Sequence, residues 1–329
     1  MSQAQDIVLE VSDVVTRFVT LDGIVKAVNG VSFRLRKGEA MAIVGESACG
    51  KSVTALSILQ LIPSPPGKIV KGEICFEGTD LLRRSEAEMR KIRGRTISMI
   101  FQEPMTCLNP VFQVGDQISE ILRLHEGVSR REAWEKSIEL LRMVGIPSPE
   151  RRVKDYPHHL SGGMRQRAMI AMAVACSPRL MIADEPTTAL DVTIQAQILE
   201  LMTSLKEKRA MSLILITHNL GVIAETAQNV MVMYAGRIFE YADVRSIFVN
   251  PRHPYTKGLL NSIPRVDQED TKKERLEAIP GLVPSPLDLP EGCKFLERCP
   301  YAFEQCAAEE PPLREDGSGH WVRCWLHES

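Results

Sequence analysis

The sequence lacks long apolar runs, a strong net charge and an abundance of aromatic residues. Its apolar stretches, such as AMAIVG and LILIT, are strand-length and far shorter than the roughly 20 residues that cross a bilayer as a helix. With 40 basic and 42 acidic residues the net charge is −2, so no global basic field favours a nucleic-acid partner. The opening MSQAQDIVLEV has neither the basic start nor the apolar core of a signal peptide. We therefore expect a globular, cytosolic protein that binds no nucleic acid.

Cysteine is sparse along most of the chain and then gathers in GCKFLERCPYAFEQC and shortly after it. Four of the eight cysteines lie there, with spacings C-x5-C, C-x6-C and C-x17-C. Because the cytosol keeps thiols reduced, disulfide bonds are a poor explanation for this group. The group consists of Cys293, Cys299, Cys306 and Cys324.

Short apolar runs alternate with helical patterns along the first part of the chain. Four runs are apolar on both faces and end in polar or glycine residues, as buried strands of a parallel sheet do. With the helices between them they predict an α/β core whose active site lies beyond the C-terminal strand ends. The predicted strands are Ala40–Val44, Ile97–Phe101, Leu180–Ala183 and Leu213–Thr217.

Two stretches depart from this alternation. At about 104–160 the pattern is helical throughout, with Ser129 at a predicted helix start and Gly145 at its end. From about residue 250 the chain becomes rich in proline and polar residues, which is typical of loops. We therefore expect an inserted helical lobe and an appended, loop-rich C-terminal region.

The segment GESACGKS, residues 45–52, matches G-x-x-x-x-G-K-S between an apolar strand and a helical pattern. In such a loop the backbone N–H groups and the helix N-terminus face phosphate oxygens. Lys51 adds positive charge at the β- and γ-phosphates, and the Ser52 hydroxyl ligates Mg²⁺. Cys49 is a filler, because the backbone does the binding. The predicted nucleotide-binding residues here are Gly45, Ser47, Cys49, Gly50, Lys51, Ser52 and Val53.

Adjacent carboxylates, Asp184 and Glu185, follow the apolar run LMIA at a predicted strand end. Two acidic residues after a strand are ordinarily solvated loop charges, but the phosphate loop changes that interpretation. Asp184 then holds Mg²⁺, and Glu185 polarises a water for attack on the γ-phosphate.

The segment LSGGMRQ, residues 160–166, opens a further helix with a serine and two glycines. This helix carries Arg165 and Arg167, so its N-terminus is a second candidate anion site. An ordinary helix N-cap is the alternative, since a lone S-G-G is common.

The order of the motifs is more specific than any one of them. GESACGKS, FQEP, LSGGMRQR, LMIADE, Ala189-Leu190-Asp191 and ITHNL together resemble the nucleotide-binding subunits of ABC transporters, from Val8 to about Tyr241. The resemblance implies a P-loop NTPase cassette, with a RecA-like core, an antiparallel β subdomain and an inserted helical subdomain. The cassette would span 1–250, and the C-terminal extension 251–329 would follow it.

The resemblance also implies roles that spacing alone leaves open. Gln102 would sense Mg²⁺ and face the membrane subunit, and His218 would contact the γ-phosphate. The signature and Asp191 would complete the ATP site of an opposing subunit. The implied Mg²⁺ ligands are Ser52, Gln102 and Asp184, and the implied signature residues are Ser161, Gly162 and Gly163.

Two positions near the phosphate loop are less certain matches to the family pattern. An aromatic residue upstream of the loop is expected to stack on adenine; Phe18 is the candidate, and a core position is the alternative. Ala48 stands where the family usually has glycine. If that position needs a positive φ, alanine adds strain without preventing binding.

Three further stretches resemble the ATP-binding subunits of dipeptide and oligopeptide importers: GES with VT after the loop, QEPMTCLNP, and RHPYT followed by Pro280-Gly281. The resemblance implies an ATPase that energises peptide import at the cytoplasmic face of the inner (cell) membrane, as one half of a head-to-tail dimer. Its partners would be a second, non-identical ATPase subunit, two transmembrane permease subunits and, indirectly, an extracytoplasmic peptide-binding protein.

Two other functions are compatible with the motifs. Nickel or another small solute could be the cargo, because the membrane and binding subunits select it. A soluble ABC ATPase acting on ribosomes or nucleic acid is the other alternative. A single cassette without a long heptad run disfavours it.

The importer resemblance bears on the cysteines. Residues 292–299 match the pattern G-C-x-F-x-x-R-C of that family's extension, whose cysteines hold a [4Fe–4S] cluster. Four thiolates are a full ligand set for such a cluster, and the tight C-x2–4-C knuckle of structural zinc sites is absent. We expect Cys293, Cys299, Cys306 and Cys324 to ligate the cluster; zinc and four free thiols are the alternatives.

Overall fold

The computed structural model describes residues 6–102, 107–188, 190–262 and 279–327. The chain divides into two compact units. The first comprises Met1–Leu9, Leu35–Ala40 and Phe76–Ile216, and the second comprises Glu10–Arg34, Met41–Cys75 and Thr217–Ser329. In the described part of the chain, no helix has the length and apolar character needed to cross a membrane.

The first unit contains three neighbouring parallel strands in the order β8-β7-β6. They are β6 (Ile97–Ile100), β7 (Leu180–Asp184) and β8 (Ser212–Ile216). Every residue of β7 and β8 is buried, which is why both strands read as continuous apolar runs. Because the strands are parallel, the segments that follow β6 and β7 leave the same edge of the sheet. The three predicted strands are confirmed.

Helices form the rest of the first unit, and the described residues 107–160 contain no strand. The start predicted at Ser129 is confirmed, since its side chain accepts a hydrogen bond from Glu132 N at 3.2 Å. Gly145 follows the helix with φ 75°, a left-handed conformation that suits glycine. The helices are α2 (Glu86–Ile92), α4 (Val114–Glu126), α5 (Arg130–Met143), α6 (Pro149–Arg152), α7 (Gly162–Val174) and α8 (Val192–Arg209), with β5 (Thr79–Asp80) and short 3₁₀ turns at Leu81–Arg83 and Pro157–His159.

Two groups of strands build the second unit. The strands β1 (Ile7–Thr20), β2 (Gly23–Arg36) and β4 (Gly67–Phe76) lie in the order β2-β1-β4. The first residues of β1 and the last residues of β2 belong to the first unit. The other group has the order β11-β12-β10-β9-β3, in which β3 and β9 are parallel. Its strands are β3 (Ala40–Val44), β9 (Asn229–Tyr234), β10 (Arg237–Asp243), β11 (Arg314–Glu315) and β12 (Trp321–Val322).

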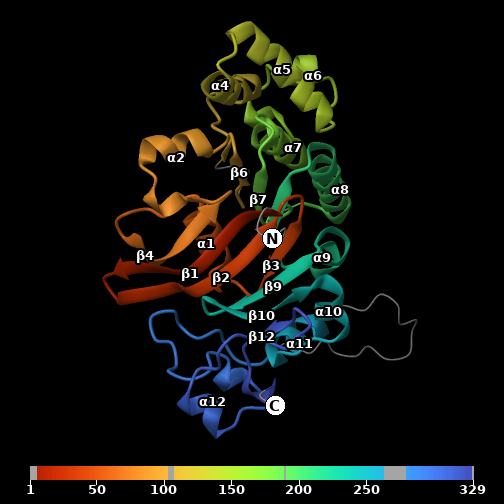
Figure 1. The fold of residues 1–329 in the computed structure, drawn as a ribbon. Coiled ribbons are helices and arrows are strands. Elements are labelled where there is room, and N and C mark those ends of the chain that lie inside the picture. Colours follow the sequence, from red (N-terminus) through yellow and green to blue (C-terminus); the bar gives the residue numbers. More distant parts are fainter. Residues whose placement is uncertain (1–5, 103–106, 189, 263–278, 328–329) are drawn as a thin grey trace, which may run out of the picture. The chain divides into compact units, whose positions relative to one another are not determined.

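The C-terminal extension contains little helix or strand, as its proline content predicts. Its strand β12 pairs antiparallel with β10, placing Val322 opposite Glu240, and the two lie side by side in Figure 1. The helices of the second unit are α1 (Lys51–Ile58), α9 (Leu220–Thr226), α10 (Val244–Val249), α11 (Pro254–Asn261) and α12 (Glu304–Ala308), with 3₁₀ turns at Leu296–Arg298 and Trp325–His327.

The extension shares its apolar core with the sheet. Phe295 and Trp325 pack into the same buried cluster as Tyr234 of β9 and Phe239 of β10, and Val44 of β3 belongs to this cluster too. Burying such side chains stabilises the fold by roughly 1.5–3 kcal/mol each. The predicted boundary at residue 250 therefore lies inside a compact unit, and the extension folds against the strand that leads into the phosphate loop.

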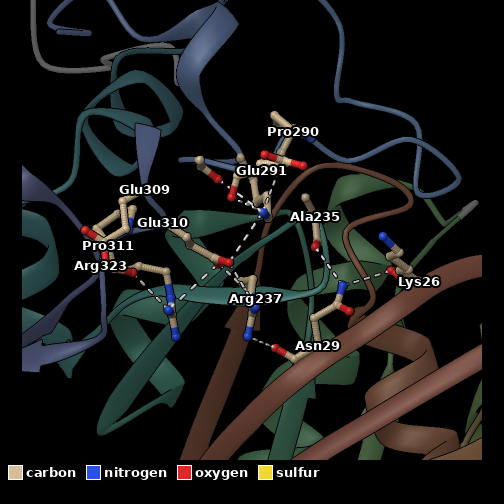
Figure 2. A network of polar contacts seen from close by, with 12 residues as sticks. Lys26, Asn29, Ala235, Arg237, Pro290, Glu291, Glu309, Glu310, Pro311 and Arg323 are labelled. Carbon is tan, nitrogen blue, oxygen red and sulfur yellow. Dashed lines mark hydrogen bonds and ion pairs between the residues drawn. The ribbon is translucent and has the colours of Figure 1, made fainter. Parts of the chain in front are cut away.

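A polar network also fastens the extension to the sheet (Figure 2). The Glu310 carboxylate pairs with Arg237 at 2.8 Å, with Lys294 at 3.4 Å and more distantly with Arg323 at 3.9 Å. Arg237 also donates to the carbonyl oxygen of Asn29 on β2, at 2.5 Å. The network thus joins the extension to β2 and to the turn between β9 and β10.

Candidate functional site

The phosphate loop, residues 45–50, connects β3 to α1 and needs glycine at both ends. Gly45 has φ 149° and Gly50 has φ 94°. A Cβ at Gly45 would lie 2.2 Å from the Met233 carbonyl oxygen, and one at Gly50 would lie 2.4 Å from that of Ala27. No side chain caps the N-terminus of α1, so its first N–H groups are available to an anion.

Lys51 begins α1 and is enclosed by the loop. Its side chain is buried, with only 6% of the residue exposed, and its Nζ donates to the carbonyl oxygens of Gly45 and Glu46, both at 2.8 Å. The loop thus curves around an ammonium group and holds it on its inner side. Ser52, the next residue of α1, is half-buried.

Two residues of the loop, Ala48 and Cys49, bear on expectations from the sequence. Ala48 has φ 63°, so it adopts the left-handed conformation that glycine would adopt without strain, at a cost of about 1–2 kcal/mol. Cys49 is fully buried, and burial raises the pKa of its thiol. A buried neutral thiol is a poor nucleophile, which agrees with a filler role.

The carboxylates lie at the end of β7 in the first unit. Asp184 is the last strand residue and is 4% exposed, whereas Glu185 leaves the strand with φ 46°. Gln102, just after β6, donates its Nε2 hydrogen to Glu185 Oε2 at 2.9 Å, and the Thr188 hydroxyl donates to the same oxygen at 3.0 Å. Two side chains therefore orient the Glu185 carboxylate.

The signature segment forms the start of α7. Ser161 is the N-cap and accepts a hydrogen bond from Met164 N at 3.4 Å, and both Ser161 and Gly162 are exposed. Gly163 packs closely on Ile194 of α8, because a Cβ there would lie 2.9 Å from Ile194 Cγ2. Asp191 caps α8 and accepts from Ile194 N at 3.0 Å. The signature and Asp191 thus lie at neighbouring helix starts.

Arg165 and Arg167 of α7 form hydrogen bonds with segments of the helical lobe. Arg165 Nε donates to the Pro157 carbonyl oxygen at 2.7 Å. Arg167 donates to the carbonyl oxygen of Val144 at 2.5 Å and to Gln197 Oε1 at 3.1 Å. Both side chains donate to backbone carbonyl oxygens of neighbouring segments. Ser161 and the two glycines are therefore the candidate anion-binding residues at the start of this helix.

Two further predicted residues lie in the second unit. His218 is exposed and directly precedes Asn219, the N-cap of α9. Phe18 on β1 is half-buried and packs over Gly67, where a Cβ would meet its ring at 2.7 Å. This contact is compatible with a packing role for Phe18, and its stacking on adenine stays a prediction.

The predicted site residues divide between the two units. The first unit holds Gln102, Ser161, Asp184, Glu185 and Asp191; the second holds Phe18, the phosphate loop and His218. Ala189 and the segment EPMT of the family motifs lie outside the described residues.

The four C-terminal cysteines line one cavity. Cys293, Cys299, Cys306 and Cys324 surround a space of about 10 Å³, with aromatic rings and His253 beside them, which is the room of about one water molecule. Burial raises the pKa of Cys293 to about 12 and of Cys324 to about 11. Among the residues that the structure describes, no three His, Cys, Asp or Glu side chains are placed to hold a single metal ion.

Sequence reasoning missed several residues around these features. Thr188 lies three residues after Glu185 in a turn and carries no motif of its own. Tyr255 and Arg298 contact Glu46 of the phosphate loop from the extension. The only sequence signal for the latter pair is that both fall in stretches characteristic of the importer subfamily, RHPYT and GCKFLERC.

Known families match the chain in the order that its motifs predict. The family described as "ABC transporter" matches residues 28–188, and the family "Oligopeptide/dipeptide transporter, C-terminal region" matches residues 239–306. The fold is similar to the dimeric structure of an ATP-binding cassette bound to ADP and Pi, with a TM-score of 0.65, 26% identity, and coverage of 72% of this chain and 99% of that one.

Full-length relatives are more similar still. A probable peptide ABC transporter ATP-binding protein of Sinorhizobium fredii is 55% identical over 97% of this chain and 95% of its own length. The oligopeptide transport ATP-binding protein OppD of Bacillus subtilis is 54% identical, with 97% and 88% covered. The dipeptide transport ATP-binding protein DppD of that organism is 51% identical, with 98% and 95% covered. The chain belongs to the family of ABC transporter ATP-binding proteins that carry the oligopeptide/dipeptide transporter C-terminal region.

Proposed function

We propose that the chain hydrolyses MgATP and couples the hydrolysis to import of dipeptides or oligopeptides. The observation that carries the proposal is similarity along nearly the whole chain, extension included, to proteins named for peptide, oligopeptide and dipeptide transport. The phosphate loop and the oriented Glu185 carboxylate support the ATPase part independently of those names.

In this proposal the phosphate loop of the second unit binds the phosphates of the nucleotide. Backbone N–H groups of the loop and the uncapped start of α1 bind phosphate oxygens, and Lys51 moves its Nζ from loop carbonyls to the β- and γ-phosphates. Mg²⁺, when bound, neutralises charge that develops on the phosphates. The residues that we assign to hold it are Ser52, Gln102 and Asp184, as the family resemblance implies.

Glu185 is the group that acts on the attacking water. Its carboxylate would accept a proton from that water, and a fixed orientation makes this acceptance efficient. Gln102 and Thr188 both donate to Oε2 and so hold the carboxylate in one orientation. His218 would contact the γ-phosphate from its exposed position after β8.

The exposed signature supports action in a dimer. Ser161 caps α7, and both Ser161 and Gly162 are exposed. We assign these two residues, with Gly163 and Asp191, to the ATP held by an opposing cassette. The partner would be a second, non-identical ATPase subunit, and the pair would bind two permease subunits at the cytoplasmic face of the membrane. A peptide-binding protein outside the membrane would deliver the cargo.

We also propose that the four cysteines ligate a [4Fe–4S] cluster. The thiolates of Cys293, Cys299, Cys306 and Cys324 would be the full ligand set of such a cluster. The four thiols line one cavity, which supports a shared ligand set. The cluster would supply folding energy to the extension.

Nucleotide binding tests the first part of the proposal. The purified full chain should bind MgATP, and Lys51→Ala should lose most of that affinity while remaining folded. Anaerobic purification with iron and acid-labile sulfide analysis tests the cluster. A colourless protein with one zinc and no sulfide would contradict it, and four alkylatable thiols without metal would contradict any metal site.

A further inference from the structure

A buried arginine of the extension, Arg298, forms a salt bridge with Glu46, the second residue of the phosphate loop. Arg298 Nη1 lies 2.6 Å from Glu46 Oε2, and Nη2 lies 3.0 Å from Oε1, so the pair is bidentate. The Arg298 side chain is 3% exposed and that of Glu46 is 31% exposed. Bidentate pairs with one buried member fix geometry more firmly than surface ion pairs do.

Arg298 is itself held from several sides. It donates to the Tyr234 hydroxyl at 3.1 Å and to the carbonyl oxygens of Pro280 at 3.0 Å and Ile279 at 3.3 Å. Its guanidinium also lies 5.9 Å from the ring centroid of Phe295. The guanidinium therefore has a fixed position, and Glu46 is bound to a rigid part of the extension.

A second residue of the C-terminal region holds the backbone at the same position. The Tyr255 hydroxyl accepts a hydrogen bond from Glu46 N at 2.8 Å, and the Glu46 carbonyl oxygen accepts one from Lys51 Nζ at 2.8 Å. Tyr255 is fully buried and its ring packs against Phe295. The N–H, the carbonyl and the side chain of Glu46 are thus all engaged.

A carboxylate in a loop that binds phosphates poses an electrostatic problem. An unpaired Glu46 would repel the negative charges of a nucleotide, since like charges at short range are unfavourable. Arg298 removes that repulsion by neutralising the carboxylate and by fixing it on the side of the loop that faces the extension. Tyr255 fixes the N-terminal arm of the loop, beside the carbonyls that hold Lys51.

We propose that Arg298 and Tyr255 are positioning residues of the nucleotide site, through which the C-terminal extension sets the affinity of the phosphate loop for MgATP. This inference rests on the proposed function of that loop. It assigns the extension a role in nucleotide binding, separate from any cluster that its cysteines hold.

The test compares MgATP affinity among variants of the full chain. Arg298→Met should weaken MgATP binding about tenfold, because Glu46 then bears an unpaired charge. Adding Glu46→Gln to Arg298→Met should restore affinity to within about threefold of the parent, because the repulsion is gone. The turnover number at saturating ATP in the assembled complex should change less than the KM, since neither residue touches the reacting atoms.

Arg323→Met is the matched control. Arg323 is a half-buried arginine of the extension that donates to the carbonyl oxygens of Ile238 and Pro311. Among the residues that the structure describes, no hydrogen bond or ion pair joins it to the loop. We expect Arg323→Met and Arg298→Met both to lower the unfolding temperature, because each removes hydrogen bonds of the extension. Arg323→Met should leave MgATP affinity unchanged. Should Arg298→Met fail to fold, Tyr255→Phe removes only the hydroxyl and should still weaken binding severalfold.

Each contrary result has a distinct meaning. Parental affinity in Arg298→Met, or in Tyr255→Phe if that is the variant that folds, would overturn the inference alone. So would an equal loss in Arg323→Met, or a failure of Glu46→Gln to restore Arg298→Met. No MgATP binding by the unmodified chain would instead overturn the proposed function and this inference with it.

Discussion

Gln102 Nε2 donates a hydrogen bond to Glu185 Oε2 over 2.9 Å, joining the segment after β6 to the residue that leaves β7. The bond exists because β6 and β7 are parallel neighbours whose C-terminal ends meet at one edge. It gives the carboxylate one orientation and engages one of its oxygens. The chemistry proposed for Glu185 depends on that orientation.

Replacing Glu185 by glutamine should separate binding from hydrolysis. Glu185→Gln keeps the shape and should bind MgATP with parental affinity, but its hydrolysis should be slower by on the order of 10²–10⁴-fold, the usual contribution of a general base. Single-turnover assays on the assembled complex measure this. Glu200→Gln, on an exposed position of α8, is the control. Parental turnover in Glu185→Gln would refute the assignment.

Thr188 offers a finer test of the same carboxylate. Thr188→Val removes the hydroxyl that donates to Glu185 Oε2 at 3.0 Å. The expected effect is about fivefold on the turnover number, corresponding to roughly 1 kcal/mol for one hydrogen bond, with MgATP affinity unchanged. Thr188→Ser retains the hydroxyl and should restore the rate. If valine and serine behave alike, the hydroxyl does not orient Glu185.

The phosphate loop should respond oppositely to two substitutions at positive φ. Gly50→Ala places a Cβ 2.4 Å from the Ala27 carbonyl oxygen at φ 94°, and the backbone strain alone is about 1–3 kcal/mol. Ala48→Gly relieves a strained alanine at φ 63°, and the entropy cost of glycine offsets part of the gain. Calorimetry should find MgATP binding abolished in the first variant and retained in the second. Retained binding in Gly50→Ala would contradict the described loop.

The four buried strands were predictable because each leaves a continuous apolar run in the sequence. Ala40–Val44 is reproduced as β3 without change, β6 and β7 differ from the prediction by one residue at one end, and β8 is shifted by one residue at both ends. The helical lobe was predictable from its period and from Ser129 and Gly145 at the ends of α5. Local patterns thus suffice where a segment's own residues determine its structure.

Contacts between distant segments were not predictable in the same way. Arg298 and Glu46 are separated by 252 positions, and nothing local to either residue indicates the other. The strand β12 has two residues, too few to show a period, and its pairing with β10 depends on the path of the extension. The motif order identified Gln102, Glu185 and the signature only through resemblance, because each is an ordinary polar residue or turn when taken alone.

The cysteine cavity yields a prediction about metal and stability together. Cys306 is buried in the core that the extension shares with β9. Cys306→Ser should therefore lose iron and sulfide and make the extension more sensitive to limited proteolysis. Cys176→Ser, in the first unit, should retain both properties. A full iron content in Cys306→Ser would remove this residue from the ligand set.

The central claim is that this chain powers peptide import by hydrolysing ATP in a complete transporter. The most direct measurement is uptake of a labelled peptide into proteoliposomes that contain the co-purified transporter, with the peptide-binding protein outside and MgATP inside. We predict uptake that requires enclosed ATP and is lost when this subunit carries Glu185→Gln. Undiminished uptake with Glu185→Gln, or uptake that does not need ATP, would contradict the claim.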